Sequence, residues 1–143
     1  MAQETSLILF KPDAVGKQIV GTVLARFEKE GFRIRGMKMM KLSDELLAEH
    51  YSHIADKPFF PEVRGFMQES PVIALAIEGD DVINRVRDLL GPTDSTQADP
   101  GTIRGDFGFK DGDSKMRNVC HASDGPETAA AELKRFFADG ELC

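Results

Sequence analysis

Apolar residues gather in short blocks along the chain, and the spacing inside each block predicts its secondary structure. Continuous apolar runs at residues 6–10 and 72–77 predict buried strands, the second of them covered on both faces. Apolar residues alternate with arginines at the start of residues 32–42, which predicts another strand, with a bulge near Gly36. A short last strand is expected at residues 118–121.

Helical spacing marks most of the segments between these strands. Apolar residues recur every three to four positions in three longer stretches and two shorter ones: 19–27, 82–90 and 129–137, then 43–47 and 59–67. Gly31 is expected to cap the first helix, and Gly91 to end the second. Asp124 and Glu127 have the spacing of a capping box ahead of the last helix.

The order of these elements predicts the fold class. It reads β-α-β-(α-α)-β-α-loop-β-α, which indicates an α+β protein with a ferredoxin-like βαββαβ sandwich. The sheet is expected to be antiparallel and four-stranded, with helices packed on one face. Residues 92–115 carry almost no periodic pattern, so a long functional loop is expected there. Because the chain has 143 residues and no repeat or linker, residues 1–143 are predicted to form a single domain.

Composition and charge narrow the classes of function. Apolar residues make up 41% of the chain and charged residues 29%, as in globular proteins. The net charge of −6, without a basic run, predicts neither a nucleic-acid partner nor a membrane partner. No apolar run approaches the ~18 residues of a membrane span. The N-terminus lacks a signal-peptide pattern, and Cys120 and Cys143 form no disulfide framework, so a reduced, cytoplasmic setting is expected.

Familiar nucleotide-binding and metal-binding motifs are missing from the sequence. It contains no P-loop, no G-x-G-x-x-G and no paired metal-ligand spacing, so no protein-held metal is predicted. Asp106-Phe107-Gly108 has the letters of a protein-kinase motif, but the accompanying catalytic-loop motif is absent and the chain is too short for that fold. A nucleotide would therefore have to be bound by other means.

The histidines differ in their settings. His50 and His53 lie on a polar helical stretch and are interpreted as surface or partly packed residues. His121 follows a predicted strand and precedes a helix N-terminus, a position that favours a bound or covalently held phosphate. Glu132 lies ~100° from Leu133, the centre of the last helix's apolar face, so it could reach inward and bond one imidazole nitrogen. A purely structural His121 and a solvated Glu132 remain the alternatives.

Positive charge for phosphate binding must come from separate segments. Four cations are candidates, and each could instead be solvated or paired with an acid: Lys11, Arg87, Arg104 and Arg117. Arg104 is flanked by glycines, which let the backbone approach a ligand closely. Phe59 and Phe60 could both be core residues, or one ring could stay at the surface and stack on a base.

Taken together, these segments resemble the nucleoside diphosphate kinase family over about residues 5–137. The resemblance is carried by Lys11-Pro-Asp-Ala-Val, His50-Tyr51, Lys57-Pro-Phe-Phe60, Glu78-Gly79, Arg87 with Gly91 and Thr93, Pro100-Gly-Thr-Ile-Arg-Gly-Asp-Phe107, and Asn118-x-x-His121-x-Ser123-Asp124. One departure is Ala122, where the family usually has Gly.

The resemblance implies an enzyme that moves the γ-phosphate of a nucleoside triphosphate to a nucleoside diphosphate in two steps. His121 matches the family's nucleophile, which becomes phosphohistidine at Nδ1. Glu132 matches the glutamate that holds the imidazole, and Ser123 its hydrogen-bonding companion. The catalytic set is therefore His121, Glu132, Ser123 and Lys11.

The resemblance also implies how the nucleotide is held. Positions that contact its phosphates or ribose are matched by Lys11, Tyr51, Arg87, Thr93, Arg104 and Asn118, and the stacking aromatic is matched by Phe59. Mg²⁺ is expected to arrive with the nucleotide, bridging its phosphates. A homo-oligomer, either tetramer or hexamer, is expected.

Two functions of other classes stay open on the sequence. A regulatory homologue would bind nucleotide without turnover. Ferredoxin-like domains also serve as small-ligand sensors or RNA-binding modules, although the acidic charge argues against RNA.

Overall fold

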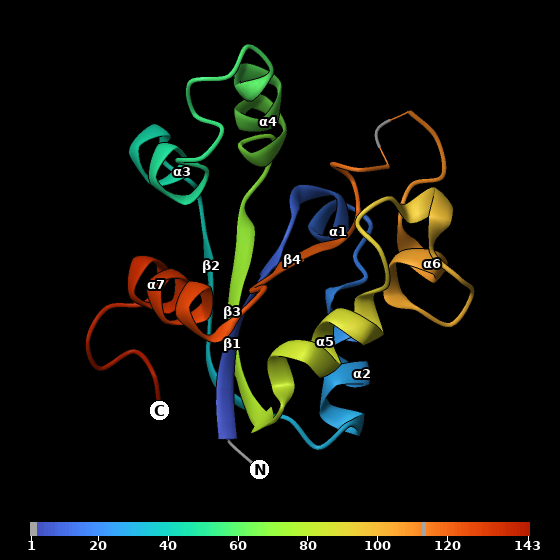
Figure 1. The fold of residues 1–143 in the computed structure, drawn as a ribbon, viewed down its shortest axis with the longest axis vertical. Helices are drawn as coiled ribbons and strands as arrows, with labels where there is room; N and C mark the ends of the chain where they lie inside the picture. The colour runs from blue at the N-terminus through green and yellow to red at the C-terminus, as the bar shows by residue number, and fades with distance from the viewer. Residues whose placement is uncertain (1–2, 113) are drawn as a thin grey trace.

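Within the described residues, four strands form one antiparallel sheet in the order β2-β3-β1-β4 (Figure 1). They are β1 (Gln3–Phe10), β2 (Arg33–Met40), β3 (Val72–Asp80) and β4 (Cys120–Ala122). The computed structural model describes residues 3–112 and 114–143. Met1 and Ala2, in the N-terminal stretch without a signal-peptide pattern, and Asp113, in the expected loop, lie outside the described residues. The antiparallel four-stranded sheet confirms the predicted fold class.

The helices follow the predicted order, with additions. They are α1 (Pro12–Gly16), α2 (Val20–Lys29), α3 (Asp44–His50), α4 (Phe60–Met67), α5 (Val82–Leu90), α6 (Ile103–Phe107) and α7 (Pro126–Phe136), with a 3₁₀ turn η1 at Ser95–Gln97. The short α1, which begins with a proline at its first position, has too few residues for a periodic pattern and was not expected. No helix among the described residues is both long and apolar enough to cross a membrane.

Helices cover both faces of the sheet, so the expectation of helices on one face is wrong (Figure 1). Ile8 and Phe10 of β1 pack into one core with α2 and α5. Leu7 and Leu9 pack into a second core with α3, α4 and α7. Because successive strand residues point to opposite faces, a strand between two cores is apolar at every position. The unbroken apolar runs in β1 and β3 have this cause.

Most predicted helix ends and the strand irregularity are confirmed. Gly31 follows α2 with a φ of +88°, a left-handed conformation that glycine adopts without steric cost. The register of β2 on β3 shifts between Ile34 and Gly36, which is the expected bulge. The capping box before the last helix is wrong, because α7 begins after Gly125 and has no side-chain cap.

The segment expected as one long loop is more ordered than its sequence pattern suggested. It contains η1 and α6, and the Thr102 hydroxyl accepts a hydrogen bond from the Gly105 backbone N–H at the start of α6. Asp106 accepts from the Gly101 backbone N–H and pairs with Arg26 at 2.7 Å. The acid of the kinase-like triplet therefore stabilises a local turn.

Candidate active site

His121 lies at the middle of β4, opposite Leu9 of β1. Leu9 belongs to the core under α7, so the His121 side chain points to the same face. Val119, the residue immediately before β4, has a φ of +77°, which is rare and strained for a β-branched side chain. Its backbone N–H donates to the Asp13 carboxylate, and its carbonyl accepts from the Lys11 backbone N–H, both at 2.9 Å. These bonds hold the sharp turn by which the chain enters β4.

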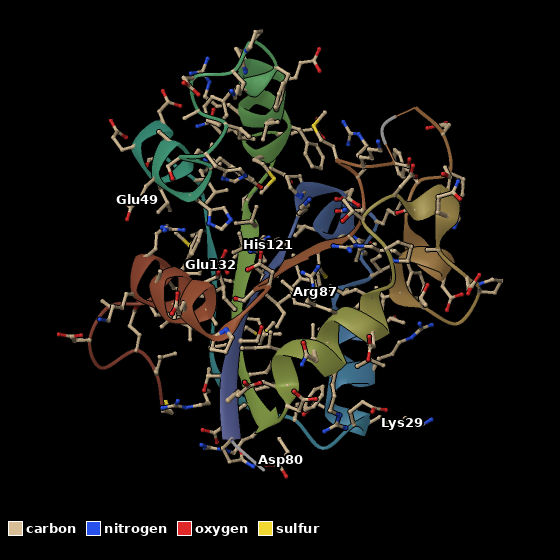
Figure 2. All side chains as sticks on the ribbon, viewed as in Figure 1. Lys29, Glu49, Asp80, Arg87, His121 and Glu132 are labelled. Carbon is tan, nitrogen blue, oxygen red and sulfur yellow. The ribbon has the colours of Figure 1, made fainter. Side chains whose placement is uncertain are left out.

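Glu132 of α7 holds the imidazole of His121. Its Oε2 lies 2.9 Å from His121 Nε2, and its Oε1 accepts a 2.6 Å hydrogen bond from the Ser123 hydroxyl. Figure 2 shows Glu132 and His121 close together, between α7 and β4. Glu132 is buried, so the solvated alternative is wrong. Burial disfavours the Glu132 carboxylate, but the bonds from His121 and Ser123 outweigh it and hold its pKa below the ordinary value.

This arrangement settles which nitrogen of His121 is available. Because ionised Glu132 can only accept hydrogen bonds, Nε2 of neutral His121 carries the proton. Nδ1 then keeps its lone pair, and no described residue bonds it. The His121 side chain is about one-quarter exposed. A ring nitrogen with a free lone pair and a fixed orientation is therefore partly exposed on the edge strand β4.

A second group of predicted residues is joined by hydrogen bonds around Asn118. Lys11 Nζ donates to the Asn118 side-chain oxygen at 2.9 Å and to the Met116 carbonyl at 3.3 Å. The Asn118 amide donates to the Thr93 carbonyl at 3.0 Å. Burial and the charge of Arg104 lower the pKa of Lys11 to about 8. The structure thus brings Lys11, Thr93 and Asn118 together, although they come from three separate segments.

Arg104 bonds the protein's own backbone to a greater extent than the sequence suggested. It is buried, and its guanidinium donates to the carbonyls of Asn118, Gly91 and Cys120 at 3.1, 3.0 and 2.7 Å. Three of its five N–H groups are therefore committed to backbone. Burial lowers the pKa of Arg104, and the charge of Arg87 acts in the same direction. Arg104 ties α6 to the end of α5 and to the entry of β4.

Arg87 and Phe59 are available for a ligand. Arg87 lies exposed on α5 and forms no ion pair with an acid in the described part of the chain, so the alternative that pairs it with one is wrong. Phe59 is 50% exposed ahead of α4, whereas Phe60 is buried. The exposed ring of the pair is therefore the one that matches the stacking aromatic.

Tyr51 and His50 add to the site. Tyr51 ends α3 and packs edge-on against His50. Burial, followed by the charge of Glu132, raises the pKa of Tyr51 to about 12, so it keeps its hydroxyl proton at neutral pH. His50 is buried and its ring centroid lies 4.8 Å from that of His121, so its interpretation as a surface or partly packed residue is wrong. The polar residues around His50 in the sequence do not predict its contact with His121, because the packing of α3 against β4 and α7 creates that contact.

A cavity of about 420 Å³ opens beside His121. Its lining comes from α3, β4 and α7 and the residues next to them: His50, Tyr51, His53, His121, Asp124, Thr128, Ala131, Glu132 and Arg135. Lys11, Arg87 and Arg104 do not line it. Arg104 instead bonds the carbonyl of Cys120, the residue before His121, so its guanidinium lies next to the backbone that carries the histidine.

One cluster in the described residues has the chemistry of a metal site. His50, His121 and Glu132 offer ligand atoms within 4.8 Å of one another. However, His121 and Glu132 already bond each other, and Arg135 donates to His50 Nδ1 at 3.0 Å. A resident metal would have to break both bonds and lie next to a guanidinium, so we assign these residues no metal.

Fold and site together define an α+β sandwich protein with a carboxylate-bound histidine next to a group of cations. The sequence profile of the family described as nucleoside diphosphate kinase matches residues 4–142. The chain belongs to the nucleoside diphosphate kinase family. The family resemblance predicted from the sequence is confirmed.

Individual relatives and structures agree with this assignment. The nucleoside diphosphate kinase of Parabacteroides distasonis is 48% identical over 139 residues, which is 97% of this chain and 88% of that protein. That of Staphylothermus marinus is 44% identical over 142 residues, 99% of this chain and 98% of that protein. The Aquifex aeolicus nucleoside diphosphate kinase structure has a TM-score of 0.91 at 41% identity, covering 99% of this chain and 100% of that one. A Halobacterium salinarum nucleoside diphosphate kinase in complex with CDP has a TM-score of 0.91 at 38% identity, covering 99% and 92%.

Proposed function

We propose that this protein is a nucleoside diphosphate kinase that works by a ping-pong mechanism through a phosphohistidine on His121. The observation that carries the proposal is the pairing of His121 Nε2 with the buried Glu132 carboxylate at 2.9 Å, which leaves Nδ1 unbonded. A histidine held in this way is oriented for attack and cannot turn its ring. The family assignment supports the same activity.

The reaction consists of two displacements at phosphorus, in which His121 Nδ1 is first the nucleophile and then the leaving group. In the first, the Nδ1 lone pair attacks the γ-phosphorus, the bond from that phosphorus to the bridging oxygen breaks, and the nucleoside diphosphate leaves. In the second, a terminal oxygen of another diphosphate attacks the phosphorus and the N–P bond breaks, which restores His121. The Nε2–H stays on the ring throughout, and Glu132 stabilises the positive charge that develops there.

Phosphoryl transfer depends mainly on positioning and charge neutralisation. We assign phosphate contacts to Lys11 and Arg87, and contacts to phosphate or ribose to Tyr51, Thr93 and Asn118. Arg104 would add positive charge near the phosphates, through the N–H groups that do not bond backbone carbonyls. The metal belongs to the substrate: magnesium bound to the nucleotide phosphates.

The base is assigned to the exposed ring of Phe59. Stacking of this kind accepts any base, because every base has a π-face. A single pocket used in turn by different donors and acceptors needs this tolerance.

A labelling experiment tests the activity most directly. Incubation with γ-labelled ATP, followed by removal of nucleotide, should leave protein-bound label that is labile to acid and stable to alkali, as expected of phosphohistidine. The non-turnover homologue would bind nucleotide and retain no label. The intact pairing of His121, Glu132 and Ser123 supports the enzyme over that alternative.

The lowered pKa of Lys11 predicts how activity depends on pH. In the free protein its pKa is about 8, so it is charged below that pH and neutral above it. Since kcat/KM reports free-enzyme groups, it is expected to fall above pH 8, approaching about tenfold per pH unit. Lys11→Arg should remove this limb, because a guanidinium stays charged. The exposed Lys29, with the variant Lys29→Met, is the control; an unchanged wild-type kcat/KM up to pH 9.5 would contradict the assignment of Lys11.

A homo-oligomer, tetramer or hexamer, is proposed together with the enzyme. β2 is an edge strand, and its Met37 and Met39 are 43% and 58% exposed. An open edge bearing apolar side chains favours pairing with another copy. We expect Met39→Glu to lower the mass seen by light scattering, with Ser52→Glu, at an exposed position outside β2, as the control. A monomeric wild-type protein at micromolar concentration would refute the oligomer.

A cytoplasmic location is proposed from the cysteines. Cys120 and Cys143 are both free thiols. Burial raises the pKa of the Cys120 thiol to about 12, so it stays protonated and unreactive. Neither cysteine requires an oxidising compartment.

A further inference from the structure

His50 and Arg135 form a pair next to His121 to which the proposed mechanism gives no role. The His50 side chain is almost completely buried, and its ring stands edge-on to that of His121 at an interplanar angle of 87°. Arg135 lies on α7, one turn after Glu132, and its Nη1 lies 3.0 Å from His50 Nδ1. It also approaches Glu49 of α3, with 3.4 Å between Nε and Oε1. Arg135 therefore joins the end of α7 to the end of α3.

The Arg135 contact determines the tautomer of His50. A guanidinium has only donors, so His50 Nδ1 must accept from it and cannot carry a proton. The proton of the neutral His50 ring is then on Nε2. Burial is the main cause that lowers the pKa of His50 to about 3, so the ring is neutral at every working pH.

The tautomer matters because Glu132 lies between two histidines. Its Oε2 is 2.9 Å from His121 Nε2 and 4.0 Å from His50 Nδ1. If His50 Nδ1 carried a proton, a small rotation would let it donate to the same carboxylate oxygen. Glu132 would then be shared, and the His121 ring would lose the partner that orients it.

We propose that Arg135 is a positioning residue that holds His50 Nδ1 as an acceptor and so reserves the Glu132 carboxylate for His121. The proposal rests on the proposed role of His121 as the phosphorylated residue. The charged and titratable groups around His50 are His121 from β4, Glu132 and Arg135 from α7, Lys11 from the end of β1, Tyr51 at the end of α3, and Glu49 of its own helix. Of these, Arg135 is the one that bonds Nδ1.

The test compares Arg135→Met with Lys134→Met, which removes the same charge from the exposed neighbouring position. Arg135→Met is expected to lower the rate of His121 phosphorylation and kcat by about tenfold, the lower end for loss of a supporting partner, with KM unchanged. Lys134→Met should have no effect. Arg135→Lys should keep most of the activity, because an ammonium can also donate to Nδ1.

The double variant Arg135→Met with His50→Phe separates positioning from general damage. Phenylalanine cannot compete for Glu132, so we expect this variant to recover kcat to within about twofold of His50→Phe alone. If the loss in Arg135→Met persists without His50, Arg135 does not act through the His50 tautomer. Full activity of Arg135→Met would also overturn the proposal.

Nitrogen NMR of the histidine rings gives a readout that needs no turnover. Long-range proton–nitrogen correlations should show His50 protonated at Nε2 in the wild type and partly at Nδ1 in Arg135→Met. An Nδ1-protonated wild-type His50 would refute the proposal even if the enzyme were active. If the wild-type protein instead formed no phosphohistidine while His50 showed the expected tautomer, the proposed function would fail and the geometric assignment would stand.

Discussion

His121→Ala is expected to abolish phosphoryl transfer while nucleotide affinity stays within a few-fold of wild type. The substitution removes the proposed nucleophile, and the cations and the stacking ring that would bind the nucleotide come from other segments. Loss of a covalent nucleophile typically costs about 10⁶-fold in kcat, so the variant should be inactive at ordinary assay sensitivity. Single-turnover labelling with γ-labelled ATP and calorimetric nucleotide binding would measure the two effects separately.

His53→Ala is the matched control for this prediction. His53 is exposed and lines the same cavity, so its replacement removes the same atoms without touching Glu132. We expect it to retain most of the wild-type kcat. Near-normal turnover of His121→Ala, or label retained on that variant, would show that the phosphohistidine mechanism is wrong.

Glu132→Gln is expected to lower kcat by about 100-fold, at the upper end for loss of an orienting carboxylate, with little change in nucleotide affinity. The two Glu132 oxygens accept from His121 and Ser123. An amide keeps the shape but carries no charge and offers only one oxygen acceptor, so it can accept from only one of these two partners and no longer stabilises positive charge on the His121 ring. If the NH₂ group faced His121, the ring would be driven to the other tautomer and Nδ1 would lose its lone pair.

Glu127→Gln, at an exposed position on the same helix, is the control for Glu132→Gln. It neutralises one carboxylate without touching the histidine. The diagnostic result is the split between kcat and KM. A large loss of nucleotide binding at unchanged kcat would mean that Glu132 contacts substrate, which contradicts its assignment as the residue that orients His121.

The fold was predictable because its strands and long helices each follow from the local spacing of apolar and polar residues. A run such as residues 72–77 is apolar throughout because helices cover both faces of β3. Gly31 and Gly91 mark helix ends since both adopt positive φ values. The sequence pattern did not show that the covering helices lie on both faces. An apolar residue indicates burial but does not indicate which helix packs on it.

Short-range order set by hydrogen bonds was harder to predict. The capping box at Asp124 and Glu127 has the right spacing, yet α7 begins after Gly125 without a side-chain cap. The helix α6 has only five residues, too few for a 3.6-residue period to be visible. The strain at Val119 also escapes sequence patterns, because it depends on a bond from its backbone to Asp13, more than a hundred positions away.

The sequence determined the family, the strand–helix order and the choice of His121 as the candidate nucleophile, because these depend on residue types at fixed spacing. Only the tertiary structure decided how the site residues work together. It buried Glu132 beside His121, turned Arg104 toward backbone carbonyls, and placed His50 between His121 and Arg135. The physical reason is that hydrogen-bond partners and burial are set by packing between distant segments, and no local pattern of apolar and polar residues specifies them.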